Sequence, residues 1–134
     1  MRFGRLRSIP FSAQARLSQK IQFSNSEQLI TAEKHCSALV ERASWENYIC
    51  IRSISDLDQR RQLFALHAFN VAILTSIQKV SQPVFAQARI QFLKDGINAI
   101  YKNEPVPEHP VLDEIKLVIE QNDLPKSWFS RLIK

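Results

Sequence analysis

The chain has 134 residues, of which 45% are hydrophobic and 23% charged, a composition typical of one globular domain. Its two glycines and two cysteines argue against a turn-rich β-sandwich, a phosphate-binding glycine loop and a disulfide-stabilised secreted domain. No apolar run approaches the roughly 18 residues that a membrane-spanning helix needs.

The formal net charge of +5 comes entirely from residues 1–26, which hold five basic residues and no acidic one. Residues 27–134 hold the other 13 basic residues and all 13 acidic residues, so this part is neutral. A nucleic-acid-binding domain would carry its excess positive charge on the folded part. The sequence therefore predicts no nucleic-acid partner.

Residues 1–26 also contain five serines. A segment that is rich in arginine and serine and free of acidic residues is typical of a mitochondrial transit peptide. We therefore predict that residues 1–26 direct the chain to mitochondria, with cleavage between Arg16 and Glu27. A disordered basic tail is the alternative interpretation.

The remaining residues, 27–134, show helical periodicity almost throughout. Ser24 to Glu27 fits a capping box, which predicts the start of a first helix that runs to about Ala43. Ser44 can cap a short second helix, and the β-branched stretch from Ile51 to Ser55 is interpreted as a connection.

A third helix is predicted to start at Asp56 or Asp58 and to run to about Val80. Its middle is apolar on all sides, which is typical of a central buried helix. Further helices are expected to begin at Pro83, Pro110 and Pro125, with a proline-rich loop over residues 103–110. The sequence thus predicts an all-α bundle of five or six helices.

No residue pattern predicts a catalytic centre or a metal site. His35 and Cys36 are adjacent, and adjacent helical residues do not face one another; no further ligands follow at zinc spacing. His67 and Asn70 lie three residues apart in the apolar helix and therefore on one face. They either line a cavity or hydrogen-bond to each other or to the backbone.

Several dispersed motifs occur in a fixed order between residues 35 and 134. They are Cys36-x-x-Leu39-Val40, Tyr48, Arg61-x-x-Phe64-Ala65-Leu66-x-Ala68-Phe69-Asn70-Val71, Arg89-x-Gln91-Phe92-x-Lys94-Asp95, Ile100-Tyr101 and His109-Pro110-Val111. In order, spacing and helix pattern this region resembles the squalene/phytoene synthase family.

The resemblance implies an all-α isoprenoid-synthase-like bundle, of which residues 27–134 would form roughly the N-terminal half. It marks four residues as family-motif positions, which are Arg61, Arg89, Gln91 and Phe92. It also suggests that His67, Phe69 and Asn70 line the family's cavity.

Active members of that family condense prenyl diphosphates, using two aspartate-rich helices that hold magnesium ions. The first of these motifs corresponds here to Leu74, Thr75 and Gln78, and no carboxylate occurs between Asp58 and Asp95. Because Mg²⁺ is bound through carboxylate oxygens, the resemblance implies no metal, no cofactor and no enzymatic activity here.

The motifs around Phe69 and Phe92 look most like one branch of the family, the mitochondrial complex I assembly factors. That branch implies a non-enzymatic role with complex I subunits or other assembly factors as partners. It also implies a location on the matrix side of the inner membrane, with peripheral membrane association. The alternatives are a prenyl-diphosphate transferase relative and an isoprenoid- or lipid-binding protein that uses the family cavity.

Overall fold

The computed structural model describes the backbone of residues 11–134 and the side chains of residues 26–134. This part of the chain forms six α-helices and no strand. The helices are α1 (Phe11–Ala43), α2 (Trp45–Arg52), α3 (Leu57–Gln78), α4 (Pro83–Lys102), α5 (Pro110–Asn122) and α6 (Lys126–Leu132). The predicted all-α class is confirmed.

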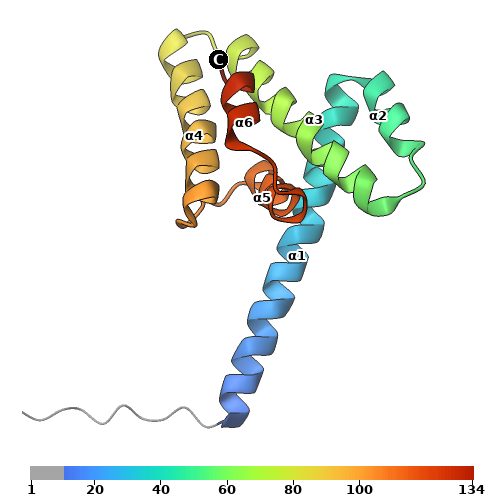
Figure 1. Cartoon of the computed structure of the whole chain (residues 1–134), viewed down its shortest axis with the longest axis vertical. Helices are drawn as coiled ribbons and strands as arrows, with labels where there is room; N and C mark the ends of the chain where they lie inside the picture. The colour runs from blue at the N-terminus through green and yellow to red at the C-terminus, as the bar shows by residue number, and fades with distance from the viewer. Residues whose placement is uncertain (1–10) are drawn as a thin grey trace, which may run out of the picture.

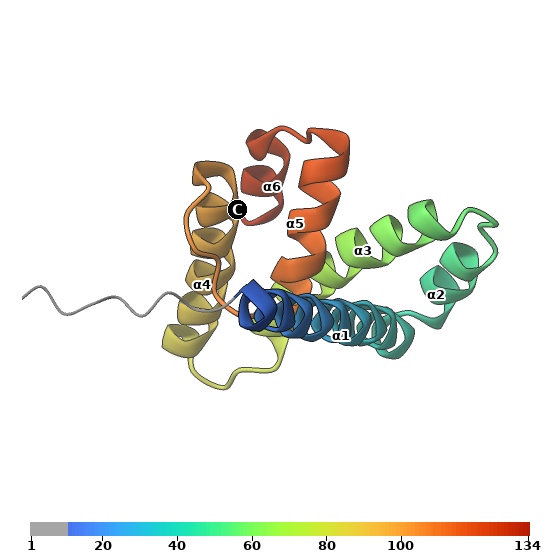
Figure 2. The same ribbon diagram turned by 90° about the horizontal axis from the view of Figure 1, so that it is seen from below.

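The helices gather around the C-terminal half of α1, while the N-terminal part of α1 extends beyond them (Figure 1). α1 packs most extensively against α3 and α5, which also contact each other. α4 lies against α3, α5 and α6, so a layer of α4 and α6 covers the side of α3 and α5 away from α2 (Figure 2).

Most of the predicted helix starts are confirmed. At each of them the structure shows either a side chain that caps the first turn or a proline at the first helical position. The Ser44 hydroxyl accepts a hydrogen bond from the Asn47 backbone N–H at 3.3 Å. The Asp56 carboxylate accepts from the backbone N–H groups of Asp58 and Gln59 at 2.9 and 3.2 Å. Pro83 and Pro110 open α4 and α5, where a missing N–H costs nothing.

Two predicted boundaries are wrong. α1 begins at Phe11 rather than at the capping box of Ser24 to Glu27, because no proline or glycine interrupts the chain between Pro10 and Ala43. α2 runs to Arg52 and includes Ile51, whose buried side chain packs into the core.

The division at residues 26 and 27 therefore lies within a continuous helix. Residues 1–10 of the predicted transit peptide lie outside the described residues, and so do the side chains of residues 11–25. The transit peptide stays a prediction.

The middle of α3 forms the centre of the hydrophobic core. Phe69 is completely buried, and its ring meets that of Phe129 edge-on with centroids 5.6 Å apart. At the C-terminal end of α3, however, Leu74 and Ile77 are 46% and 56% exposed. The prediction of a central buried helix is therefore confirmed for one face of the middle of α3, whereas Asn70 in the middle and Leu74 and Ile77 in the last turns are exposed.

The close approach of α4 and α5 depends on Gly96. A Cβ atom built at this buried glycine would overlap the Leu112 side chain, which is itself fully buried. The absence of a side chain at Gly96 thus lets Leu112 fill the space between the two helices. This contact holds the start of α5 near the cavity described below.

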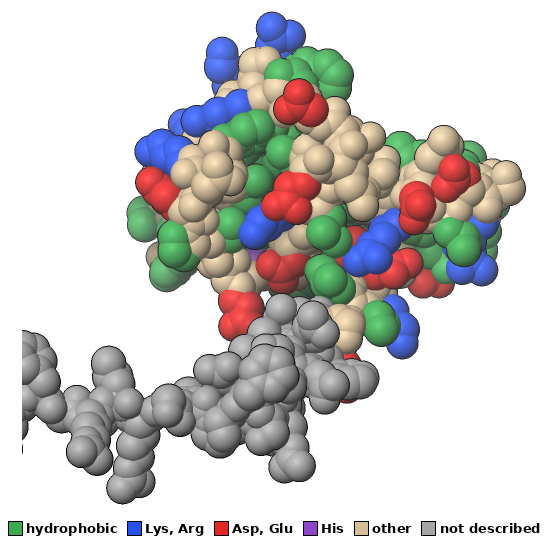
Figure 3. Space-filling view, turned by 60° about the horizontal axis from the view of Figure 1, so that its bottom comes forward, with side chains coloured by type: hydrophobic (Ala, Val, Ile, Leu, Met, Phe, Trp, Pro, Cys, Tyr) green, Lys and Arg blue, Asp and Glu red, His purple; other side chains and the backbone are tan. Residues whose placement is uncertain are grey.

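The surface of residues 26–134 carries mixed charges. Figure 3 shows acidic and basic side chains interspersed over much of one face, with apolar side chains between them. Among the described residues, no helix combines the length and the hydrophobicity that crossing a bilayer requires.

The two cysteines differ strongly in their environments, and thiol labelling should distinguish them. Burial, reinforced by the nearby Glu114 carboxylate, raises the pKa of the Cys36 thiol to about 12, whereas Cys50 is exposed. Since the thiolate is the reactive species, iodoacetamide at pH 8 should modify Cys50 and leave Cys36 intact until the chain unfolds. Mass spectrometry of the labelled peptides measures this, and equal labelling of both thiols would contradict the described core.

Candidate functional site

A cavity of about 830 Å³ lies where α1, α3, α4 and the start of α5 meet. We call it the central cavity. Its polar lining residues are His35, Thr75, Ser76, Lys79, Ser81, Gln82, Arg89 and His109. Its apolar lining residues are Leu39, Ala72, Val80, Phe85, Ala88, Phe92, Leu93 and Val111.

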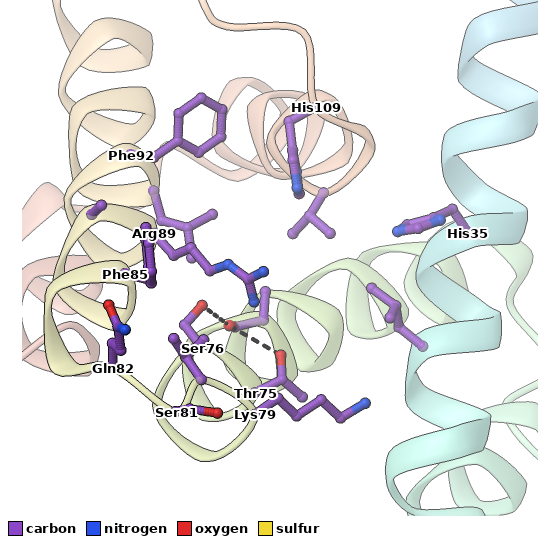
Figure 4. Close-up of a pocket in the computed structure, with 16 residues that line it drawn as sticks. His35, Thr75, Ser76, Lys79, Ser81, Gln82, Phe85, Arg89, Phe92 and His109 are labelled. Carbon is purple, nitrogen blue, oxygen red and sulfur yellow. Dashed lines mark hydrogen bonds between the residues drawn. The ribbon is translucent and has the colours of Figure 1, made fainter.

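Arg89 and Lys79 supply the positive charge of the central cavity. Figure 4 shows the Arg89 side chain extending from α4 toward Ser76 and Thr75 on α3. Those two hydroxyls donate to the Ala72 carbonyl at 2.7 and 3.3 Å. No described carboxylate lies within 4.0 Å of either cation.

His109 points into the same cavity from the residue before α5 (Figure 4). Its Nδ1 atom is buried and has no hydrogen-bond partner among the described residues. Its ring meets the Phe92 ring with centroids 5.7 Å apart. Burial, and secondarily the positive charge that His35 can carry, lower the pKa of His109 below its ordinary range.

The lowered pKa of His109 has a direct consequence for stability. The unfolded chain binds the histidine proton more tightly than the folded chain does, so the free energy of unfolding should fall as the pH drops below about 6.5. In His109→Gln, the part of this fall in the free energy of unfolding that comes from His109 should vanish. Urea unfolding at pH 7.5 and 5.5 measures the difference, and an unchanged pH dependence in His109→Gln would contradict it.

Arg61, a family-motif residue, lies outside the central cavity and forms an ion pair between α3 and α5. Its Nε and Nη2 atoms donate to both carboxylate oxygens of Glu114 at 2.8 and 2.7 Å. Glu114 is 1% exposed, and Glu33 on α1 approaches Arg61 at 3.8 Å. The hydrogen bond to Glu114 raises the pKa of Arg61, so the guanidinium keeps its positive charge. Its geometry indicates a structural role, joining three helices.

The other sequence-predicted residues divide between two environments. Arg89 and Phe92 line the central cavity, whereas the Gln91 side chain points to the surface and donates to Asp95 at 2.7 Å. Phe69 lies in the core, His67 is half-buried and Asn70 is exposed; none of the three lines the central cavity. Their predicted ligand role stays untested.

Sequence reasoning did not assign Lys79, His35 or His109 to a common site. They come from three separate helices or helix ends, and no local spacing relates them. The described residues contain no group of three or more histidine, cysteine, aspartate or glutamate side chains that could hold a metal ion.

Comparison of the sequence with known protein families shows to which family this chain belongs. The family model for squalene/phytoene synthase matches residues 40–134, which is more than half of the chain. The chain belongs to the squalene/phytoene synthase family. No solved structure matches it.

Three curated relatives illustrate the similarity. NADH dehydrogenase (ubiquinone) complex I, assembly factor 6 homolog from Drosophila melanogaster is 34% identical over 75% of this chain and 31% of its own length. Complex I assembly factor 6 from Bos taurus is 30% identical and that from Homo sapiens 29%, each over 75% of this chain and 30% of its own length. The chain therefore spans about a third of these relatives.

Within the squalene/phytoene synthase fold, α3 carries the positions where the resemblance places the first aspartate-rich motif. Thr75 lines the central cavity, whereas Leu74 and Gln78 are exposed on the same helix and do not line it. None of the three has a carboxylate, and neither does any other described residue that lines the cavity.

Proposed function

We propose that this chain acts without catalysis as an assembly factor for mitochondrial respiratory complex I. The names of its relatives suggest the role. The observation that carries the non-catalytic part is the carboxylate-free lining of the central cavity, which includes Thr75.

The chemical argument starts from the diphosphate leaving group of prenyl transfer. Its departure needs a cation cluster to stabilise the developing charge, and magnesium is held by carboxylates. A leucine, a threonine and a glutamine at the motif positions cannot bind such a cluster. Prenyl transfer by these residues is therefore disfavoured.

The same proposal includes a place and partners for the chain. The arginine- and serine-rich segment of residues 1–26 supports import into mitochondria. We propose that the chain acts on the matrix side of the inner membrane, in peripheral contact with it. Its partners would be complex I subunits or other assembly factors.

Deletion of the gene tests the assembly role. Mitochondria from deleted cells, separated on a native gel and stained for NADH dehydrogenase activity, should contain less assembled complex I. Complex III measured on the same gel is the matched control and should not change. Normal complex I in the deleted cells would refute the proposal.

A turnover assay tests the absence of catalysis separately. The purified chain, given farnesyl diphosphate and Mg²⁺, should release no inorganic diphosphate above the rate without protein. Magnesium-dependent release that is lost in Arg89→Gln and kept in Lys94→Gln would instead support a prenyl-diphosphate transferase relative. Lys94 is a suitable control because it lies on α4, exposed and outside the central cavity.

A further inference from the structure

We propose that one face of the domain, formed by α4 and residues 124–134, lies on a membrane surface of anionic phospholipids, with Trp128 and Leu132 inserted between the headgroups. We call this face the α4–α6 layer. The inference rests on the peripheral membrane contact proposed above, and it adds which face makes that contact and which lipid class it requires. It does not involve the central cavity.

The first observation is an uneven distribution of charge over residues 27–134, which are neutral as a whole. The α4–α6 layer contains six basic side chains and one acidic side chain, whereas the rest of these residues contain seven basic and twelve acidic side chains. Figure 3 shows basic side chains gathered along the upper left of the molecule, with apolar side chains beside them. An anionic surface would therefore attract the α4–α6 layer and repel the remainder, which fixes the orientation of the domain.

The basic side chains of the α4–α6 layer are available to an external anion. Five of the six are exposed and lie outside the central cavity; they are Lys94, Lys102, Lys126, Arg131 and Lys134. No described carboxylate lies within 4.0 Å of any of these five cations. The single carboxylate of the layer, that of Asp95, accepts a hydrogen bond from Gln91 at 2.7 Å.

Apolar side chains alternate with these charges on α6. Trp128 is 56% exposed and Leu132 is 51% exposed. Arg131 and Leu132 follow Trp128 by three and four residues, so the three side chains share one side of the helix. Phe129, in contrast, is buried and packs against Phe69. α6 is thus attached to the core while a tryptophan, an arginine and a leucine stay together at the surface.

A groove between α4 and the end of α6 continues this surface. It has a volume of about 530 Å³, and its lining includes Val84, Ile90 and Lys94 of α4 and Ile133. Val84 is 69% exposed. Apolar side chains beside a lysine without an ion pair therefore recur on α4, so the surface is not confined to α6.

The residue types of the α4–α6 layer favour a membrane over an acidic protein as its partner. Lysine is depleted in protein–protein interfaces, yet four of the five exposed cations are lysines. A lysine stem can lie along an apolar boundary while its ammonium group reaches the headgroups. Tryptophan is enriched at the level of the headgroups, because its indole ring is apolar and carries one polar N–H group.

Co-sedimentation of the purified full chain with lipid vesicles tests the proposal. The chain should bind vesicles made of equal parts of phosphatidylcholine and phosphatidylglycerol, and should bind pure phosphatidylcholine far more weakly. Each cation near an anionic surface contributes a factor of about 5 in affinity. The double variant Lys126→Gln, Arg131→Gln should therefore weaken binding to the anionic vesicles by at least about 10-fold.

The matched control is the double variant Lys34→Gln, Arg52→Gln. It also removes one exposed lysine and one exposed arginine in the last turn of a short helix, but these residues lie on α1 and α2. The five basic residues of segment 1–26 are present in all the variants, so their contribution to binding is common to them. The control should bind like the unchanged chain. Equal losses in the two double variants, or no loss in either, would overturn the proposal.

The two tryptophans give a second readout of the same contact. Trp45 on α2 is 59% exposed and Trp128 is 56% exposed. In Trp45→Phe all tryptophan emission comes from Trp128, and it should move to shorter wavelength when anionic vesicles are added, because the indole ring leaves water. In Trp128→Phe the emission of Trp45 should stay unchanged. A shift of the Trp45 emission, or none of the Trp128 emission, would contradict the proposed orientation.

The vesicle experiments and the gene deletion can fail independently, since one measures the purified chain and the other measures assembled complex I. The circular dichroism of each variant should match that of the unchanged chain, because the replaced side chains are exposed. If the folded chain does not bind anionic vesicles, the α4–α6 layer is not a membrane-binding surface, whatever the deleted cells show. An acidic protein would then be the partner that its charge fits.

Discussion

Phe69→Ala should destabilise the chain by about 3–5 kcal/mol, the largest effect that we expect from a single substitution. Phe69 has no exposed surface, and its ring packs edge-on against Phe129 of α6. Removing the ring leaves a cavity between α3 and α6 and takes away the edge-on contact with Phe129. Urea unfolding followed by circular dichroism measures the loss.

Asn70→Ala is the matched control for Phe69→Ala. The two residues are neighbours on α3, and sequence reasoning gave both the same ligand role, but Asn70 is exposed. Its substitution should change the free energy of unfolding by no more than about 0.5 kcal/mol. Similar losses in both variants would contradict the core position of Phe69.

Arg61→Met should destabilise the chain by about 3 kcal/mol, because it leaves Glu114 buried without a partner. Glu114 is 1% exposed and takes both of its strong hydrogen bonds from Arg61. The double variant Arg61→Met, Glu114→Leu removes both charges and should regain most of this loss. The free energy of unfolding of the two single variants and the double variant gives the coupling.

Lys116→Met controls for the loss of one positive charge near α5. Lys116 is exposed on the same helix as Glu114 and has no ion pair among the described residues. Its substitution should have little effect on stability. If Arg61→Met were no more costly than Lys116→Met, the pair would not hold α3 and α5 together.

The helices themselves could be predicted from local chemistry. Asp56, Ser44, Pro83 and Pro110 each mark a helix start through a group that acts within three residues, so a single sequence contains the signal. The start of α1 was missed because the residue pattern of a capping box, Ser24 to Glu27, here lies inside a longer helix.

The ion pair of Arg61 with Glu114 was not predicted, because its partners are 53 residues apart. One signal was available. Glu114 lies three residues after Val111 and four before Val118, which places a carboxylate on the apolar stripe of its helix. A buried carboxylate needs a cation, and Arg61 was marked as a motif residue without an assigned partner.

The central cavity could be predicted only in part. The resemblance marked Arg89 and Phe92, which do line it. Its other charged groups, Lys79, His35 and His109, come together only because α1 and the start of α5 pack beside α3 and α4. That proximity depends on contacts such as Leu112 over Gly96, which no spacing in the sequence reveals.

The most direct test of the account is rescue of the gene deletion with residues 1–134 alone, measured as assembled complex I on a native gel. We predict that complex I falls in the deleted cells and returns to the wild-type amount when the chain is expressed. The Leu74→Asp variant should restore no more complex I than the unchanged chain does, since the proposed role involves no metal ion. Deleted cells whose complex I does not fall would contradict the account, whereas a loss that residues 1–134 do not restore would show that the role needs more of the protein than these residues.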